Sequence, residues 1–177
     1  ARTRYSLALS RFRKIPRTED SLRGENQCLA GLARMSLELG ENARCEQYRD
    51  EARQLRDSVL RNQQFAGALQ VEFLRDEVAW AMEKKEFERA VPLLEDILGA
   101  RSGARDRLEP RSRAVPLRQL GQCLLVQGKG AEAEGRFREA LAIYERVGAA
   151  DSERLELLLN LAQANFQQGK RRQSMAL

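Results

Sequence analysis

The chain has 177 residues and a formal net charge of +5, a length that suits one domain and is too short for a multidomain enzyme. Apolar residues make up 42% and charged residues 32%, with only 12 Gly and 4 Pro, which disfavours wholesale disorder and a turn-rich β-sandwich and leaves a helical protein. No histidine and no C-x-x-C pair occur, which argues against Ser-His-Asp catalysis, Cys-His catalysis and the common zinc sites, so we expect no enzymatic activity, metal or cofactor.

The positive charge is concentrated at the start of the chain. Residues 1–17 contain no acidic residue and carry the basic residues Arg2, Arg4, Arg11, Arg13, Lys14 and Arg17. The remainder of the chain is slightly acidic. A basic helix of this kind suggests one alternative function, nucleic-acid binding through phosphate contacts. The aromatic content of 6% provides little base stacking, so a solvated helix face is the favoured interpretation and nucleic acid is a disfavoured partner.

Residues 3–15 form the first predicted helix. Ala8, Phe12 and Ile15 have the spacing of the inner stripe in the second helix of a helical hairpin. We therefore expect the chain to begin with a partial repeat over residues 1–16. Stacked repeats need terminal surfaces that tolerate water, so uncapped ends of this kind would allow self-association.

One pattern of small and apolar residues then recurs along the chain. Its small residues form two sets, Ala33, Val78, Gly121 and Ala162 in the first and Cys45, Ala90, Ala133 and Ser174 in the second. The first set lets one helix approach its neighbour closely, and the second set lies where the following helix crosses it. Gly40, Gly128 and Gly169 are predicted to end the first helix, because glycine adopts a left-handed cap at little cost. Each copy is a helical hairpin that needs stacked neighbours to bury both faces, as in an α-solenoid.

The copy around Gly121 resembles the tetratricopeptide (TPR) signature. The residues that carry the resemblance are Leu117, Leu120, Gly121, Leu124, Gly128, Ala133, Phe137 and Ala140. The usual TPR repeat is about 34 residues long, whereas equivalent positions here are 45, 43 and 41 residues apart. Longer helices or longer loops between repeats are therefore expected.

This resemblance implies an all-α fold, a right-handed α-solenoid of stacked antiparallel helical hairpins. We expect a single domain over residues 1–177. Its repeats are predicted at residues 1–16 (partial), 26–60, 71–98, 114–147 and 155–177 (partial). The function implied is that of a non-catalytic scaffold for protein–protein interaction.

The longer repeats also resemble the FAT scaffold of the phosphatidylinositol-3-kinase-related kinases. The segments concerned are residues 32–34 (Leu-Ala-Arg) and, about 45 residues further on, the run from Trp80 to Glu86. Both families stack helical hairpins, so the expected architecture is the same. The function would differ, because this second resemblance implies a fragment of a helical scaffold in a large kinase.

In the TPR family the first helix of each hairpin lines the concave face of the solenoid. Transferring those positions to this sequence predicts a set of partner-binding residues: Arg34, Glu38, Glu72, Arg75, Asp76, Arg118, Gln119, Gln122, Asn160 and Gln163. Amides and alternating charges suit an extended or helical peptide held by polar contacts, with Leu125 and Phe166 as apolar spots. The predicted partner is therefore a protein or peptide.

The sequence also bears on location. No apolar run approaches the 18 to 20 residues that span a bilayer, so no membrane association is expected. Cys28, Cys45 and Cys123 are odd in number and lie within apolar helical patterns, which favours buried thiols over a disulfide framework. An intracellular protein, cytoplasmic or nuclear, is the corresponding expectation.

Overall fold

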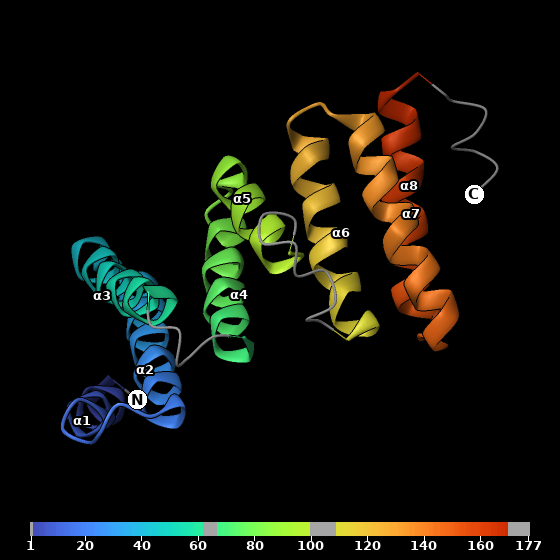
Figure 1. Ribbon diagram of the computed structural model, residues 1–177. Helices are drawn as coiled ribbons and strands as arrows, with labels where there is room; N and C mark the ends of the chain where they lie inside the picture. The colour runs from blue at the N-terminus through green and yellow to red at the C-terminus, as the bar shows by residue number, and fades with distance from the viewer. Residues whose placement is uncertain (1, 62–66, 100–108, 170–177) are drawn as a thin grey trace. The chain divides into compact units, whose positions relative to one another are not determined.

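The computed structural model describes residues 2–61, 67–99 and 109–169, which form eight α-helices and no strand (Figure 1). The helices are α1 (Arg2–Phe12), α2 (Glu19–Glu38), α3 (Asn42–Arg61), α4 (Ala68–Glu83), α5 (Phe87–Ile97), α6 (Pro110–Val126), α7 (Gly130–Val147) and α8 (Asp151–Gln167). No helix in these ranges combines the length and the apolar content that spanning a bilayer requires. The all-α class predicted from the sequence is confirmed, and α2, α4, α6 and α8 are the first helices of the predicted hairpins.

The chain divides into two compact units, residues 1–76 and residues 77–177, and the division falls inside α4. In the first unit, α1 and α3 both pack against α2. The core of this unit consists of the buried side chains of Leu9, Leu22, Cys28, Leu29, Leu32, Leu55, Val59, Leu69 and Phe73. Each helix turns its apolar stripe toward this cluster, which accounts for the helical periodicity of the sequence.

In the second unit the helices pack in chain order, α5 against α6, α6 against α7 and α7 against α8. Small residues lie at these crossings as expected, and Ala90, Ala133 and Ala140 have no exposed surface. Ala162 is half-buried, and Ser174 lies outside the described residues. Residues 170–177 of the predicted repeat at residues 155–177 lie there as well.

The predicted helix ends share one backbone geometry. Gly40, Gly128 and Gly169 have φ of +72°, +76° and +73°. The fourth copy has Lys85 at this register position, and Lys85 takes φ +59°, the left-handed region that glycine normally fills. The N–H of Glu86 then donates to the carbonyl of Ala81 at 2.8 Å. The same bond, from the residue after the glycine to the carbonyl five residues earlier, closes the helices that end at Gly40 and Gly128.

Candidate protein-interaction face

All the predicted contact residues lie on the first helices of the hairpins. In the first unit they are Arg34 and Glu38 on α2 and Glu72, Arg75 and Asp76 on α4; in the second unit they are Arg118, Gln119 and Gln122 on α6 and Asn160 and Gln163 on α8. The repeat register therefore placed each of them on the expected element. Each unit holds half of the set.

In the first unit, Glu72 and Asp76 link α4 to α2. Nε of Arg23 lies 2.7 Å from Oε2 of Glu72, and Nδ2 of Asn26 donates to Oδ2 of Asp76 at 2.5 Å. Desolvation raises the pKa of Asp76, although the hydrogen bond from Asn26 acts in the opposite direction. These two carboxylates thus hold neighbouring first helices together. The other predicted residues of this unit, Arg34, Glu38 and Arg75, are exposed.

In the second unit, polar contacts join α6 to α8 near both ends and near the middle. Arg118 forms an ion pair with Glu156, and Arg111 lies 3.8 Å from Glu153. Toward the ends of the two helices, Nε2 of Gln167 donates to the carbonyl of Leu125 at 3.3 Å. Together they fix α8 beside α6, so that side chains from both helices form one surface.

We call this surface the α6–α8 face. It consists of Val115, Arg118, Gln119, Gln122 and Val126 on α6 and of Leu155, Glu156, Leu159, Asn160, Gln163 and Phe166 on α8. Large apolar side chains are exposed on it, with Val126 and Leu159 at 62%, Leu155 at 57% and Phe166 at 56%. Leu155, Leu159 and Phe166 share one side of α8, because their spacings of four and seven residues are close to whole helical turns. The face thus combines an apolar ridge with amide side chains.

Asn160 is the most constrained polar group of the face. Its side chain is half-buried, and its Nδ2 has no hydrogen-bond partner within the described part of the chain. A buried amide donor without a partner costs about 1–3 kcal/mol.

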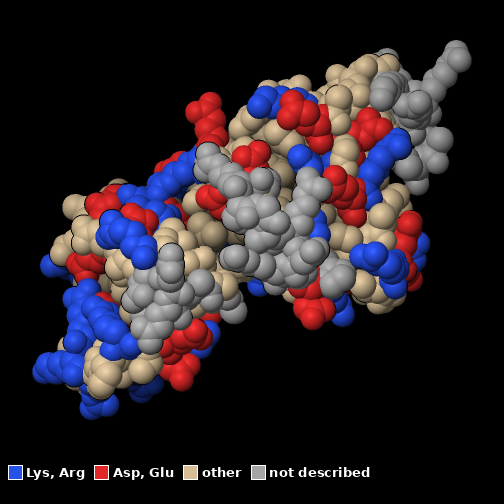
Figure 2. Space-filling model, viewed as in Figure 1, with Lys and Arg blue, Asp and Glu red and all other residues tan. Residues whose placement is uncertain are grey.

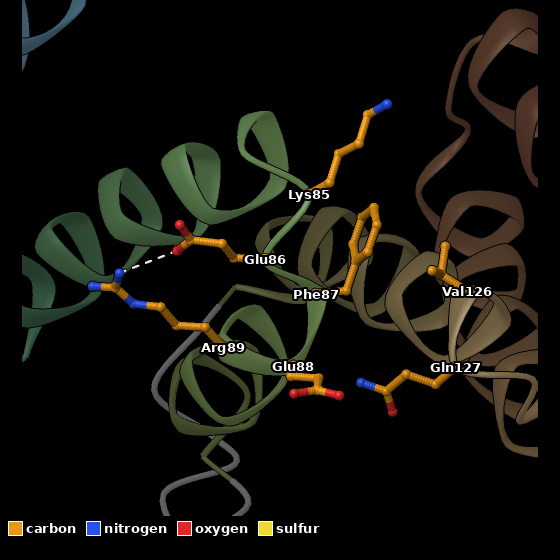
Figure 3. A pocket seen from close by; sticks show the side chains of 7 residues that line it. All are labelled: Lys85, Glu86, Phe87, Glu88, Arg89, Val126 and Gln127. Carbon is orange, nitrogen blue, oxygen red and sulfur yellow. Dashed lines mark hydrogen bonds and ion pairs between the residues drawn. The ribbon is translucent and has the colours of Figure 1, made fainter. Parts of the chain in front are cut away.

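An open hollow of about 570 Å³ adjoins the face at the end of α6 (Figure 3). Val126 belongs both to the α6–α8 face and to the wall of this hollow, where the ring of Phe87 lies opposite it. Arg89 is engaged by Glu86 and Glu77. The remaining walls come from Lys85, Glu88 and Gln127. The hollow provides an apolar recess with polar groups around it.

The face presents apolar side chains, amides and one ion pair. Within the described ranges, no group of three or more His, Cys, Asp or Glu residues is arranged to hold a metal ion. Glu156 on the face is paired with Arg118, and Glu86 beside it is paired with Arg89. Apolar burial and amide hydrogen bonds are the interactions that the face can offer a partner.

One part of the predicted face is wrong. Leu125 was expected to be an apolar contact, but only 4% of it is exposed, because it turns into the core of the second unit. Its neighbour Val126 is exposed instead. Leu155 and Leu159 were missed, although Leu159 stands one hairpin after Arg118 in the repeat register. Had the repeat spacing been applied from Arg118 to α8, it would have included Leu159 among the predicted contact residues.

Comparison with known protein families finds a match in the C-terminal part of the chain. Residues 112–177, which include α7, α8 and most of α6, match the tetratricopeptide repeat. TPR repeats generally mediate protein–protein interactions and are usually non-catalytic. No curated protein sequence is significantly similar to the chain.

Solved structures resemble the whole chain at low sequence identity. The apo form of RapI matches with a TM-score of 0.71 and 14% identity, covering 97% of this chain and 58% of RapI. BtubC (BKLC) from P. vanneervenii matches with a TM-score of 0.73 and 14% identity, covering 99% of this chain and 69% of BtubC. A Rap protein complexed with competence and sporulation factor matches with a TM-score of 0.60 and 17% identity, covering 99% of this chain and 47% of that protein.

These likenesses establish the fold, an all-α TPR-like solenoid architecture of sequential hairpins. The chain spans little more than half the length of RapI and about half that of the complexed Rap protein. The TPR resemblance seen in the sequence is confirmed over residues 112–177. The FAT resemblance receives no support from these comparisons.

Proposed function

We propose that the chain is a non-catalytic protein-interaction domain that binds an extended or helical peptide segment of a partner protein through the α6–α8 face. The observation that carries the proposal is the exposed apolar ridge of Leu155, Leu159 and Phe166, set beside the amides of Gln122 and Gln163. Monomeric surfaces seldom keep large apolar side chains grouped in this way unless a partner covers them.

The energetics of this ridge suit peptide recognition. Burying one Leu or Phe side chain contributes about 1.5–3 kcal/mol, so a partner that covers the ridge gains several times that amount before association costs are subtracted. The amides on the same face can each donate and accept hydrogen bonds, which matches the alternating N–H and C=O groups of a peptide backbone. The apolar ridge would supply affinity and the amides would supply orientation.

The comparisons support this proposal in two ways. The residues that match the tetratricopeptide repeat include α8 and most of α6, the two helices that carry the face. A protein of similar fold, the Rap protein, has been solved in complex with competence and sporulation factor. An intracellular location forms part of the proposal, because Cys28, Cys45 and Cys123 are buried cysteines that form no disulfide.

The test is selection of peptides on the intact chain. A random peptide library displayed on phage is selected against the immobilised protein, and the enriched peptides are titrated by fluorescence anisotropy. We expect the double variant Leu159→Ser/Phe166→Ser to bind them at least about tenfold more weakly. Both side chains are more than half exposed, so the fold should survive the substitutions.

The matched control is Leu39→Ser, which removes an equally exposed leucine from outside the face, since Leu39 is 61% exposed at the end of α2. Affinity should be unchanged in this variant. The double variant Arg118→Ala/Asn160→Ala probes the polar part of the face in the same assay. Full retention of binding by both double variants would remove the α6–α8 face as the binding site.

A further inference from the structure

Helix α1 is docked on α2 through aromatic rings that lie on glycines. A Cβ added to Gly31 would lie 2.8 Å from the ring of Tyr5, and one added to Gly24 would lie 2.3 Å from the ring of Phe12. Leu9, between these two rings on the same side of α1, is only 7% exposed. This side of α1 is therefore fully used in holding the helix to the first unit.

A second apolar stripe runs along another side of the same helix. Together with flanking arginines it forms the α1 groove, a hollow of about 370 Å³ lined by Arg4, Leu7, Ala8, Arg11, Phe12 and Ile15. Leu7 is 54% exposed and Ile15 is 48% exposed. A helix that is apolar on two sides is normally buried on both. Only one of the two sides is buried in this unit.

The two charged residues that line the α1 groove, Arg4 and Arg11, are both basic. Arg2, Arg13 and Arg17 are engaged by Glu41, Glu25 and Glu51. Arg4 and Arg11, which line the groove, take part in no side-chain ion pair or hydrogen bond within the described part of the chain. Lys and Arg side chains gather over α1 at the lower left of Figure 2. The groove thus presents apolar side chains between unpaired positive charges.

We propose that the α1 groove binds an amphipathic helix of another protein, one whose apolar stripe is flanked by Asp or Glu. On α1 the lining residues recur at spacings of three and four from Arg4 to Phe12, a stretch of just over two helical turns or roughly 12 Å, and Ile15 extends the groove beyond the end of the helix. A partner helix with anchors at i, i+3, i+4 and i+7 fills such a groove along its length. Acidic residues beside those anchors would pair with Arg4 and Arg11.

The shape and the charge of the groove favour this occupant over an anionic bilayer. Membrane-surface helices present a protruding apolar face with many free cations. Here the apolar residues line a hollow, and Arg2, Arg13 and Arg17 are already neutralised by acidic residues of the same unit. The cations left for a membrane are too few to hold the chain there strongly.

The experiment uses a synthetic helical peptide of roughly 20 residues with Leu at the anchor spacing and Glu beside it, and a second peptide in which Lys replaces each Glu. Binding to the intact chain is measured by fluorescence anisotropy. We expect the acidic peptide to bind and the basic one not to bind. Leu7→Ser/Ile15→Ser should weaken binding at least about tenfold. Arg4→Glu/Arg11→Glu should reverse the preference to the basic peptide.

The control for net charge is Arg61→Glu/Arg146→Glu, which changes two exposed arginines outside the groove and should leave the preference unchanged. Circular dichroism checks that every variant remains helical. Four results would overturn the proposal: no binding of the acidic peptide, equal binding of the basic one, preferential binding to phosphatidylserine vesicles, or a dimer of the chain that Leu7→Ser/Ile15→Ser dissociates. The last would make a second copy the occupant of the groove.

Discussion

The ring of Phe137 on α7 lies directly on the backbone of Gly121 on α6: a Cβ added to Gly121 would come within 2.5 Å of Cε1 of Phe137. Phe137 is completely buried. The ring can approach the α6 backbone this closely because glycine has no side chain. The same arrangement joins Tyr5 to Gly31 in the first unit.

Gly121→Ala is therefore expected to destabilise the protein, even though alanine is the better helix former. Forcing one extra carbon into a packed contact costs about 1–3 kcal/mol, which exceeds the gain of about 0.5–1 kcal/mol from helix propensity. Urea unfolding followed by circular dichroism measures the change. Gly135→Ala is the matched control, since a Cβ at Gly135 meets nothing within 4 Å, and it should stabilise the protein. An equal gain in both variants would contradict the packing argument.

The repeat pattern predicted the skeleton of the fold because its residues act locally. Small residues recur at helix crossings, and glycine recurs at helix ends, so Gly40 and Gly128 could be placed from their spacing alone. Lys85 shows the limit of this approach. Its side chain gives no sign of a left-handed backbone, and only the register reveals that it stands where the other copies have glycine.

The candidate site was predicted less completely than the fold. The register placed Glu72, Asp76 and Arg118 on the correct helices, yet each of them is engaged by a neighbouring helix. The pairing of charged residues depends on the distance between helices that are far apart along the chain. A single sequence does not reveal that distance. The apolar ridge at Leu155 and Leu159 was missed because exposed leucine is indistinguishable by type from buried leucine.

Lys85→Gly should stabilise the second unit. A non-glycine residue in the left-handed region costs about 1–2 kcal/mol of backbone strain. Glycine removes this strain but loses more chain entropy on folding, so only part of the cost is recovered. We expect a net gain of about 0.5–1 kcal/mol in urea unfolding. Gly128→Ala tests the same geometry in reverse and should destabilise by a similar amount, because Gly128 has φ +76°. A loss of stability in Lys85→Gly would mean that the lysine side chain itself contributes more than its backbone costs.

We predict that the folded protein loses stability at alkaline pH because of Cys123. Its thiol has no exposed surface and lies 3.3 Å from Sδ of Met82. Burial raises its pKa from 9.0 to about 11. The thiol therefore loses its proton at a lower pH in the unfolded chain than in the folded chain. Its contribution to the free energy of unfolding is intact below pH 9 and is lost as pH rises toward 11, by about 2–3 kcal/mol in total.

Urea midpoints at pH 8 and pH 10.5 measure this loss in the wild type and in Cys123→Ala. Tyr144, whose pKa burial also raises, contributes equally to both proteins and cancels in the comparison. The alanine variant should start less stable and lose less between the two pH values. Parallel loss in both proteins would show that the thiol stays protonated in the unfolded chain over this range or that it is accessible when folded.

Asn160→Leu separates stability from binding on the α6–α8 face. The Nδ2 of Asn160 is buried and has no hydrogen-bond partner within the described part of the chain, so an apolar side chain of similar size should raise stability by about 1 kcal/mol. The same substitution replaces a half-buried amide of the face by an apolar side chain, and we expect selected peptides to bind about tenfold more weakly. Gln163→Leu is the control, because Gln163 is an exposed amide whose removal should leave stability unchanged. Increased stability with unchanged affinity would show that the amide takes no part in recognition, whereas decreased stability would show that it is already satisfied in the folded protein.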